Sequence, residues 1–297
     1  MKSAWVALFL LNSFSHLHAQ SFSFDSLATA AITPATFSAS FWGDYDGDGY
    51  LDFILCGRDT SNQLFSSLFQ NDGAGAFTEI AAGLVPVELG ATAWADYDND
   101  GDLDLLITGR ESGSQKNARI YRNDAGQFTD IAAPLAGVSR AAAAWGDYDN
   151  DGRTDLLLMG KDDAGMAVSK LYHNDGSDAF GESGFALAGL HSGTAVWFDF
   201  DSDGRLDFLL TGADNTDLPV TKIYRNTASG FTVTDLAGFA NSSAAVGDFD
   251  QDGDADIVLT GVTVDSLTSA KIYLNDGAGN FTDANVQLDG LHSGSAH

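Results

Sequence analysis

Aspartates recur in five short loops of the sequence at a spacing suited to a metal ion. In the first loop, Asp44, Asp46, Asp48 and Asp52 occupy positions 1, 3, 5 and 9, and Gly49 occupies position 6. Alternate positions of a tight loop can aim three carboxylates inward, and the glycine permits a sharp turn. The backbone carbonyl at position 7 would add an oxygen ligand, and the carboxylate at position 9 would complete the shell. Without a cation, four carboxylates this close together would repel one another.

The other four loops repeat this pattern in full, which favours metal sites over aspartates that merely form turns. Their carboxylates belong to Asp96, Asp98, Asp100 and Asp104; Asp147, Asp149, Asp151 and Asp155; Asp199, Asp201, Asp203 and Asp207; Asp248, Asp250, Asp252 and Asp256. The five position-7 carbonyls are those of Tyr50, Asp102, Arg153, Arg205 and Asp254. We expect about five Ca²⁺ sites, since Mg²⁺ keeps its waters and resists a cage of protein oxygens.

An EF-hand is the alternative metal site, and it fits the sequence poorly. That loop needs an acid at position 12 and flanking helices. Position 12 here is apolar in every loop: Leu55, Ile107, Leu158, Leu210 and Leu259.

The loops belong to an internal repeat. Their first aspartates are spaced 52, 51, 52 and 49 residues apart. A second motif of the form Tyr-x-Asn-Asp-Gly recurs in phase, and its aromatic residue lies 25 residues after the first aspartate in every unit: Phe69, Tyr121, Tyr172, Tyr224 and Tyr273. One supersecondary unit therefore occurs five times, and we place its copies at about residues 38–90, 91–141, 142–193, 194–242 and 243–297.

Each unit predicts four strands. Small and apolar residues such as Ala141–Trp145 precede a loop, and an apolar run of about five residues follows it, which is too short for a helix. A third strand surrounds the aromatic residue, and a hairpin turn leads into a fourth strand. Four strands at this period predict an all-β fold, a β-propeller of four-stranded blades. A β-solenoid and a string of separate small domains are the alternatives.

The ends of the chain suggest that the ring is incomplete at its C-terminus. Phe24–Leu27 resembles a spare fourth strand, and Gly290–Ala296 matches Gly189–Ala195, which leads into the fourth loop. We therefore expect five full units and the start of a sixth.

Composition limits the possible partners and the compartment. Forty-two acids against 14 basic residues give a net charge of −28, which would repel nucleic acid. Cys56 is the single cysteine and is expected to be a small buried hydrophobe. Met1–Ala19 has the pattern of a signal peptide, with a buried first strand as the alternative, and no later stretch is apolar enough to span a membrane. Secretion to the extracellular space or the cell surface is expected.

No catalytic motif is recognisable, and we expect no enzyme activity. His191 and His292 occupy equivalent repeat positions that suggest packing, and His173 is expected at an exposed strand site. The four glutamates occupy scattered positions typical of solvated residues: Glu79, Glu88, Glu111 and Glu182.

The two motifs together resemble the FG-GAP/VCBS repeat family, the blades of integrin-α-like β-propellers, over about residues 22–297. The resemblance implies a Ca²⁺ between the first and second strand of each blade. It also implies a secreted or surface module for adhesion or for binding an extracellular protein or glycan. The alternative function is the propeller portion of an extracellular carbohydrate-active enzyme such as a polysaccharide lyase.

Overall fold

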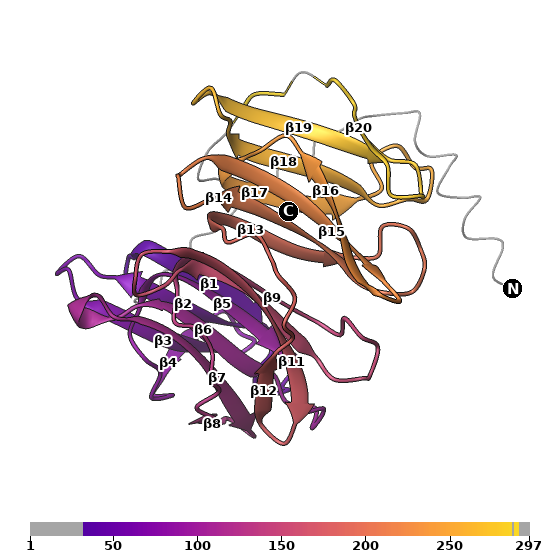
Figure 1. The fold of residues 1–297 in the computed structure, drawn as a ribbon. Helices are drawn as coiled ribbons and strands as arrows, with labels where there is room; N and C mark the ends of the chain where they lie inside the picture. The colour runs from indigo at the N-terminus through magenta and orange to yellow at the C-terminus, as the bar shows by residue number, and fades with distance from the viewer. Residues whose placement is uncertain (1–31, 287, 291–297) are drawn as a thin grey trace, which may run out of the picture.

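The computed structural model describes residues 32–286 and 288–290. These residues form five four-stranded antiparallel sheets and one short 3₁₀ turn (Ser112–Ser114). Figure 1 shows the sheets following one another in chain order, from indigo to yellow. The predicted all-β fold of four-stranded blades is confirmed, and we refer to each sheet as a blade. No helix in this part of the chain has the length and apolarity to cross a membrane.

The strands of each blade pair in chain order. Blade 1 contains β1 (Thr36–Gly43), β2 (Asp52–Arg58), β3 (Leu64–Asn71) and β4 (Phe77–Ile80). Blade 2 contains β5 (Glu88–Ala95), β6 (Asp104–Arg110), β7 (Lys116–Asp124) and β8 (Gln127–Asp130). Blade 3 contains β9 (Ser139–Gly146), β10 (Asp155–Lys161), β11 (Ala167–Gly176) and β12 (Ala179–Glu182). Blade 4 contains β13 (His191–Phe198), β14 (Asp207–Ala213), β15 (Pro219–Thr227) and β16 (Gly230–Leu236). Blade 5 contains β17 (Ala240–Gly247), β18 (Asp256–Val262), β19 (Thr268–Asn275) and β20 (Phe281–Asp283).

Three expectations lie outside the described residues. These are the signal peptide at residues 1–19, the spare strand at residues 24–27 and, apart from Gly290, the beginning of a sixth unit at residues 290–296.

The second strand of each of the three inner blades is buried on both faces because neighbouring blades cover it. In β10 every residue except Lys161 is buried, and β14 is buried throughout. Consecutive first strands lie beside one another, from β1 through β5, β9 and β13 to β17. The small residues of these strands, such as Ala141–Ala144, permit this close approach.

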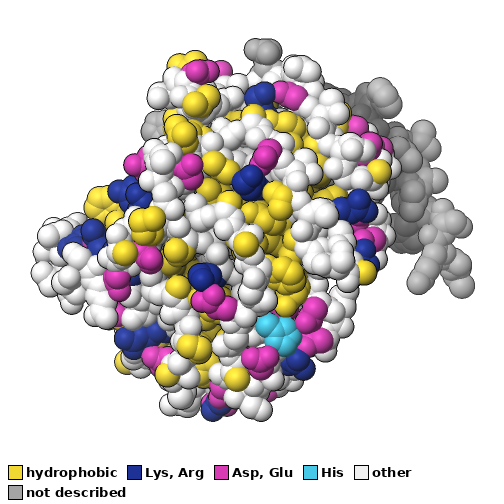
Figure 2. All heavy atoms as spheres, in the orientation of Figure 1, with side chains coloured by type: hydrophobic (Ala, Val, Ile, Leu, Met, Phe, Trp, Pro, Cys, Tyr) yellow, Lys and Arg dark blue, Asp and Glu magenta, His cyan; other side chains and the backbone are white. Residues whose placement is uncertain are grey.

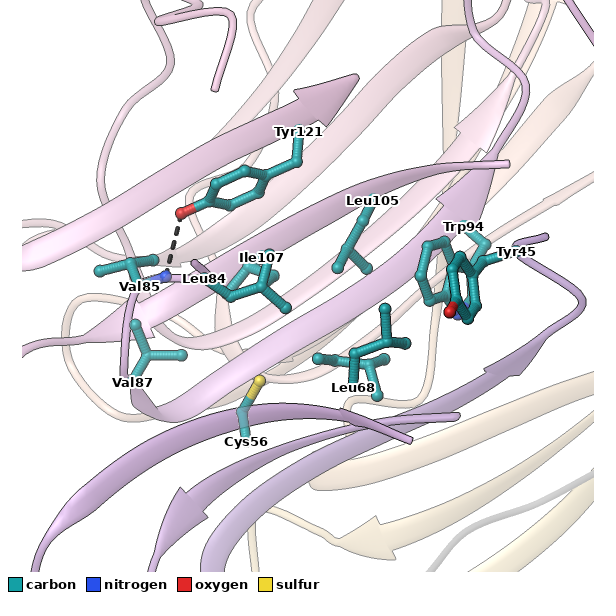
Figure 3. Close-up of a cluster of buried hydrophobic side chains, with 11 residues drawn as sticks. Tyr45, Cys56, Leu68, Leu84, Val85, Val87, Trp94, Leu105, Ile107 and Tyr121 are labelled. Carbon is teal, nitrogen blue, oxygen red and sulfur yellow. Dashed lines mark hydrogen bonds between the residues drawn. The ribbon is translucent and has the colours of Figure 1, made fainter. Parts of the chain in front are cut away.

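A hydrophobic core fills each of the four junctions between successive blades. Figure 3 shows the first of them, where Cys56 is buried as expected. Tyr121 reaches across this core, and its hydroxyl accepts a hydrogen bond from Val85 N at 3.0 Å. Tyr172 and Tyr224 accept equivalent bonds from Ala136 N and Ala188 N, both at 2.8 Å. The hydroxyls thus satisfy backbone donors of the linkers that connect the blades.

Tryptophan indoles also bind successive first strands together. Trp197 Nε1 donates to Ala144 O of the preceding blade at 3.1 Å. The indole lies over Gly146, where a Cβ atom would be 3.0 Å from the ring. Gly43 accommodates Trp94 in the same way, since a Cβ there would be 2.7 Å from the indole. A small residue in one blade therefore makes room for a tryptophan in the next.

The junction between blades 4 and 5 reverses this fit. Blade 4 has Phe198 at the position of Gly146, and blade 5 has Val246 at the position of Trp197. Phe198 is 7% exposed and belongs to the core of this junction, against which Val246 packs. The loss of tryptophan in the fifth repeat is therefore compensated by an aromatic ring from the fourth.

Glu88 corrects the expectation that all four glutamates are solvated. Its side chain is fully buried between two arginines, Arg58 of blade 1 and Arg110 of its own blade. Arg110 Nη2 lies 2.6 Å from Glu88 Oε1, and Arg58 Nη2 donates to the same oxygen at 2.8 Å. Hydrogen bonds from Arg58 and then from Arg110 lower the pKa of Glu88 despite its burial. The carboxylate therefore joins two blades at the end of the fold away from the aspartate loops.

In this junction the large side chain, Phe198, belongs to blade 4 and the smaller one, Val246, to blade 5. We therefore expect the effects of substitutions at these two positions on stability to be coupled. Phe198→Gly should destabilise the protein by about 3–5 kcal/mol, because it leaves a void. Val246→Trp should cost about 1–3 kcal/mol, because the indole would meet Phe198. The double variant recreates the glycine–tryptophan fit of the other junctions, so it should be more stable than the sum of the two single effects predicts. Urea unfolding of all four proteins measures this coupling. Strictly additive effects would show that the two side chains do not share one space.

Candidate metal centres

Each aspartate loop connects the first strand of a blade to the second. In the first loop, the Asp44 carboxylate accepts hydrogen bonds from Asp48 N at 3.1 Å and Gly49 N at 2.9 Å. The other four loops repeat both bonds at 2.9–3.2 Å. The position-1 carboxylate is therefore held in place by the backbone of its own loop.

The position-6 glycines are required by backbone conformation. Their φ values lie between 82° and 98°, a region that favours glycine. A Cβ atom at these positions would meet nothing within 4 Å. The sharp turn expected at these glycines is confirmed, and conformation alone accounts for them.

Three carboxylates converge in each of the first four loops. One oxygen from each member of a set lies within 4.8 Å of the others, and the sets are Asp44, Asp46 and Asp48; Asp96, Asp98 and Asp104; Asp147, Asp149 and Asp155; Asp199, Asp201 and Asp203. The Asp201 side chain is 3% exposed, and its Oδ2 forms an ion pair with Arg225. Its Oδ1 has no hydrogen-bond partner among the described residues, and a buried oxygen of this kind fits a site that a metal ion would complete.

The position-9 aspartates are the most buried members of the loops, with exposures of 0–2%. One oxygen accepts the position-2 N–H of the same loop at 2.8–3.2 Å. The other accepts the N–H of an asparagine in the third strand at 2.6–2.8 Å. A carboxylate oxygen has a second lone pair, so these bonds leave it able to bind a cation. The predicted ligand thus also anchors its loop to the blade.

Burial raises the pKa of four of these carboxyl groups, those of Asp52, Asp104, Asp155 and Asp207. The pKa reaches about 7 at Asp104 and about 6 at Asp155 and Asp207, although backbone hydrogen bonds oppose the rise. A bound cation requires the deprotonated form and would therefore displace protons from these groups.

The asparagine of the second motif has a role that the sequence did not reveal. Asn174 Nδ2 donates to Tyr97 O of the preceding blade at 2.8 Å and to Thr154 O of its own blade at 3.1 Å. Three further asparagines make both bonds, namely Asn123, Asn226 and Asn275. We call this contact the asparagine latch. Because the accepting carbonyl belongs to position 2 of the preceding loop, the latch connects one candidate metal centre to the next blade.

A signal for the latch was present in the fourth repeat. There the hairpin sequence departs from Asn-Asp-Gly, yet Asn226 is retained before Thr227 and Ala228. If Asn226 were needed only for the turn, it could have changed together with Thr227 and Ala228. Its retention indicates a role outside the turn.

The loops differ in how nearby side chains neutralise the negative charge of their aspartates. We expected Arg153 and Arg205 to contribute only carbonyls, but their guanidinium groups form ion pairs with Asp151 and Asp203 of the same loops. Their Nε atoms also donate to Asn174 O at 2.6 Å and Asn226 O at 3.1 Å. The third and fourth loops therefore contain protein cations beside the candidate ligands.

His173 lies closer to a loop than an exposed strand site would place it. Its Nε2 is 3.1 Å from Asp149 Oδ2 and 3.4 Å from Asp151 Oδ2, and its side chain is 24% exposed. The second and fifth loops instead have an additional acid at position 7, Asp102 or Asp254.

Comparison with known families identifies the repeat. A family model described as an FG-GAP-like repeat matches residues 44–107, 96–158 and 199–259. Each match begins at the first aspartate of one loop and ends within the second strand of the next blade. The matched unit therefore includes a complete loop and a junction between blades. No curated protein shows significant similarity to the chain.

The asparagine latch predicts that Asn174→Ala destabilises the protein. The substitution leaves two carbonyls without a donor, and a loss of about 1–3 kcal/mol in the free energy of unfolding is expected. Asn280→Ala is the matched control, because the Asn280 side chain is exposed and bonds only to Asp276. Urea unfolding compares the two variants. Equal effects would contradict a structural role for the latch.

Proposed function

Because the chain belongs to the FG-GAP-like repeat family, we propose that it is a secreted or cell-surface calcium-binding module that binds an extracellular ligand without catalysing a reaction. Calcium has a structural role in this proposal and stiffens the connection between the first two strands of each blade. The convergence of three carboxylates in a backbone-organised loop is the observation that carries the proposal.

The donor set favours Ca²⁺ among the common metals. The predicted ligands are all oxygens, four carboxylates and one carbonyl in each loop, and Ca²⁺ accepts six to eight oxygens in flexible geometry. The ion would offset the repulsion among carboxylates that the latch and the position-9 hydrogen bonds hold together. Calcium would thereby stabilise both the loop and the junction with the next blade.

The chain's acidity supports metal binding more than attraction to a basic partner. Twenty of the 42 acids belong to the five predicted ligand sets. On the face shown in Figure 2, acidic side chains are spread among lysines and arginines. A single acidic patch does not dominate that face.

The differences among the loops predict graded affinities. Arg153 and Arg205 already neutralise part of the charge in the third and fourth loops. Asp102 and Asp254 increase the negative charge of the second and fifth loops. The second and fifth loops should therefore bind Ca²⁺ more tightly than the third and fourth.

Calcium titration of the metal-free protein tests the proposal. We expect about five sites of micromolar to millimolar affinity by calorimetry, and a higher melting temperature as they fill. Asp147→Asn should remove about one site, because it deletes a ligand charge and keeps only one of the two oxygens that accept the loop N–H groups. Asp265→Ala is the control, since Asp265 is exposed in the turn between β18 and β19. A melting temperature unaffected by Ca²⁺, together with no heat of binding, would refute the metal assignment.

The proposed location has its own test. Expressed with residues 1–19 in a secreting host, the protein should appear in the medium with Gln20 as its first residue. Leu8→Asp should retain it in the cell, because the charge interrupts the apolar stretch of the signal peptide. N-terminal sequencing and a cell-fraction assay measure both outcomes. Extracellular protein that still begins at Met1 would contradict cleavage.

A further inference from the structure

A cavity of about 440 Å³ lies among the five first strands, at the end of the blades opposite the aspartate loops. Every blade contributes the second residue of its first strand to the cavity wall: Phe37, Leu89, Arg140, Ser192 and Asn241. We call this space the central cavity. Its volume lies in the range of small-ligand sites.

The five wall residues share a strained backbone conformation. Their φ values lie between 46° and 53°, and each lies at a bulge where the pairing with the second strand shifts register. This conformation is costly for residues with a Cβ atom, and glycine would relieve the cost. None of the five is glycine, and the five differ from one another. The five units thus share one backbone conformation at this position but differ in side-chain chemistry. This is the pattern expected of residues that determine the specificity of a binding site.

Arg140 is the one arginine of the described residues without an ion pair. Every other arginine in that part of the chain lies within 4.0 Å of a carboxylate oxygen. Arg140 is exposed and forms no hydrogen bond with another described residue. In a chain with 42 acids, an arginine that lines a cavity and has no ion pair within the described part of the chain is available to an external anion.

The surrounding groups leave Arg140 free. It also lines an adjoining pocket that contains Asp217 and His191. Asp217 Oδ1 is already engaged by Lys161 Nζ at 3.3 Å and His191 Nε2 at 3.2 Å. His191 Nδ1 in turn lies 2.9 Å from Ser192 Oγ. Asp217 is therefore already paired with Lys161 and His191 and forms no ion pair with Arg140.

The other wall residues indicate the chemical class of the ligand that carries the anionic group. Phe37 is 60% exposed and offers an aromatic face. Asn241 is exposed and offers amide donors and an acceptor, and Ser38 adds a hydroxyl. An apolar face, hydrogen-bonding groups and one guanidinium are complementary to a sugar ring that bears hydroxyls and a carboxylate.

We propose that the central cavity binds an acidic sugar unit through its carboxylate, with Arg140 as the anion-binding residue. This proposal rests on the extracellular binding role proposed above and specifies its ligand. An extended acidic peptide fits less well, because the bulges interrupt the regular strand edge with which a peptide backbone would pair. The ligand meets the blades at the end opposite the calcium loops, so the two sites are separate.

A titration with a glucuronate-terminated disaccharide tests the site. The full chain is used at saturating Ca²⁺, produced without N-glycosylation because Asn241-Ser242-Ser243 is an acceptor sequence. We expect binding of the disaccharide and at least tenfold weaker binding of its neutral glucose-terminated counterpart. Arg140→Gln should weaken disaccharide binding at least tenfold, and Arg140→Lys should weaken it less, since lysine keeps the charge but loses the bidentate geometry.

Lys170→Gln is the matched control, because it removes the same charge from the third strand of blade 3. It should bind the disaccharide as the unaltered protein does. Equal binding by the protein and Arg140→Gln, or tighter binding of a tetraglutamate peptide than of the disaccharide, would overturn the proposal. Calcium binding is measured on the same samples. Absence of disaccharide binding with all Ca²⁺ sites filled would refute the sugar site alone, whereas absence of Ca²⁺ binding would refute the calcium proposal.

Discussion

The structure depends on one buried carboxylate in each blade, the aspartate at position 9. Asp155 illustrates the arrangement, because its two oxygens accept N–H groups from its own loop and from Asn174 of the third strand. The amide of that asparagine then reaches the loop of the preceding blade. A single hydrogen-bonded path thus connects loop, strand and neighbouring blade. Removing any member would leave buried polar groups without partners, which is costly in a low-dielectric interior.

This path explains why candidate metal centres and blade packing cannot be treated separately. The residue at position 2 of a loop donates its N–H to the position-9 aspartate of that loop, and its carbonyl accepts from the asparagine of the next blade. A cation that tightens the loop would therefore act on the junction as well. The two arginines at position 7 show a second solution, in which a side-chain charge from the loop itself neutralises an aspartate. The repeats share a backbone but balance their charge differently.

Sequence comparison among the five units predicted the features that every unit repeats. The strands, the glycine conformation and the exclusion of an EF-hand by apolar residues such as Leu55 within β2 all follow from that periodicity. The contacts between units could not be predicted from the repeat alignment, because they join residues that are far apart in the sequence. The Asn174 amide bonds to a carbonyl 77 residues earlier, and Glu88 pairs with Arg58 at a separation of 30 residues. Glu88 occurs in one unit only, so the alignment of repeats contained no signal for its burial.

The exchanged sizes of Phe198 and Val246 have a consequence for how such chains diversify. The residues that must match belong to two different repeats, 48 positions apart. A duplication or shuffling event with breakpoints between repeats would separate this pair and set Phe198 against a tryptophan. Only a transferred segment that begins before Phe198 and ends after Val246 would keep the matched pair intact. The heritable module of this architecture is therefore the interface between two blades, and a grafted segment should include the first strands of both blades.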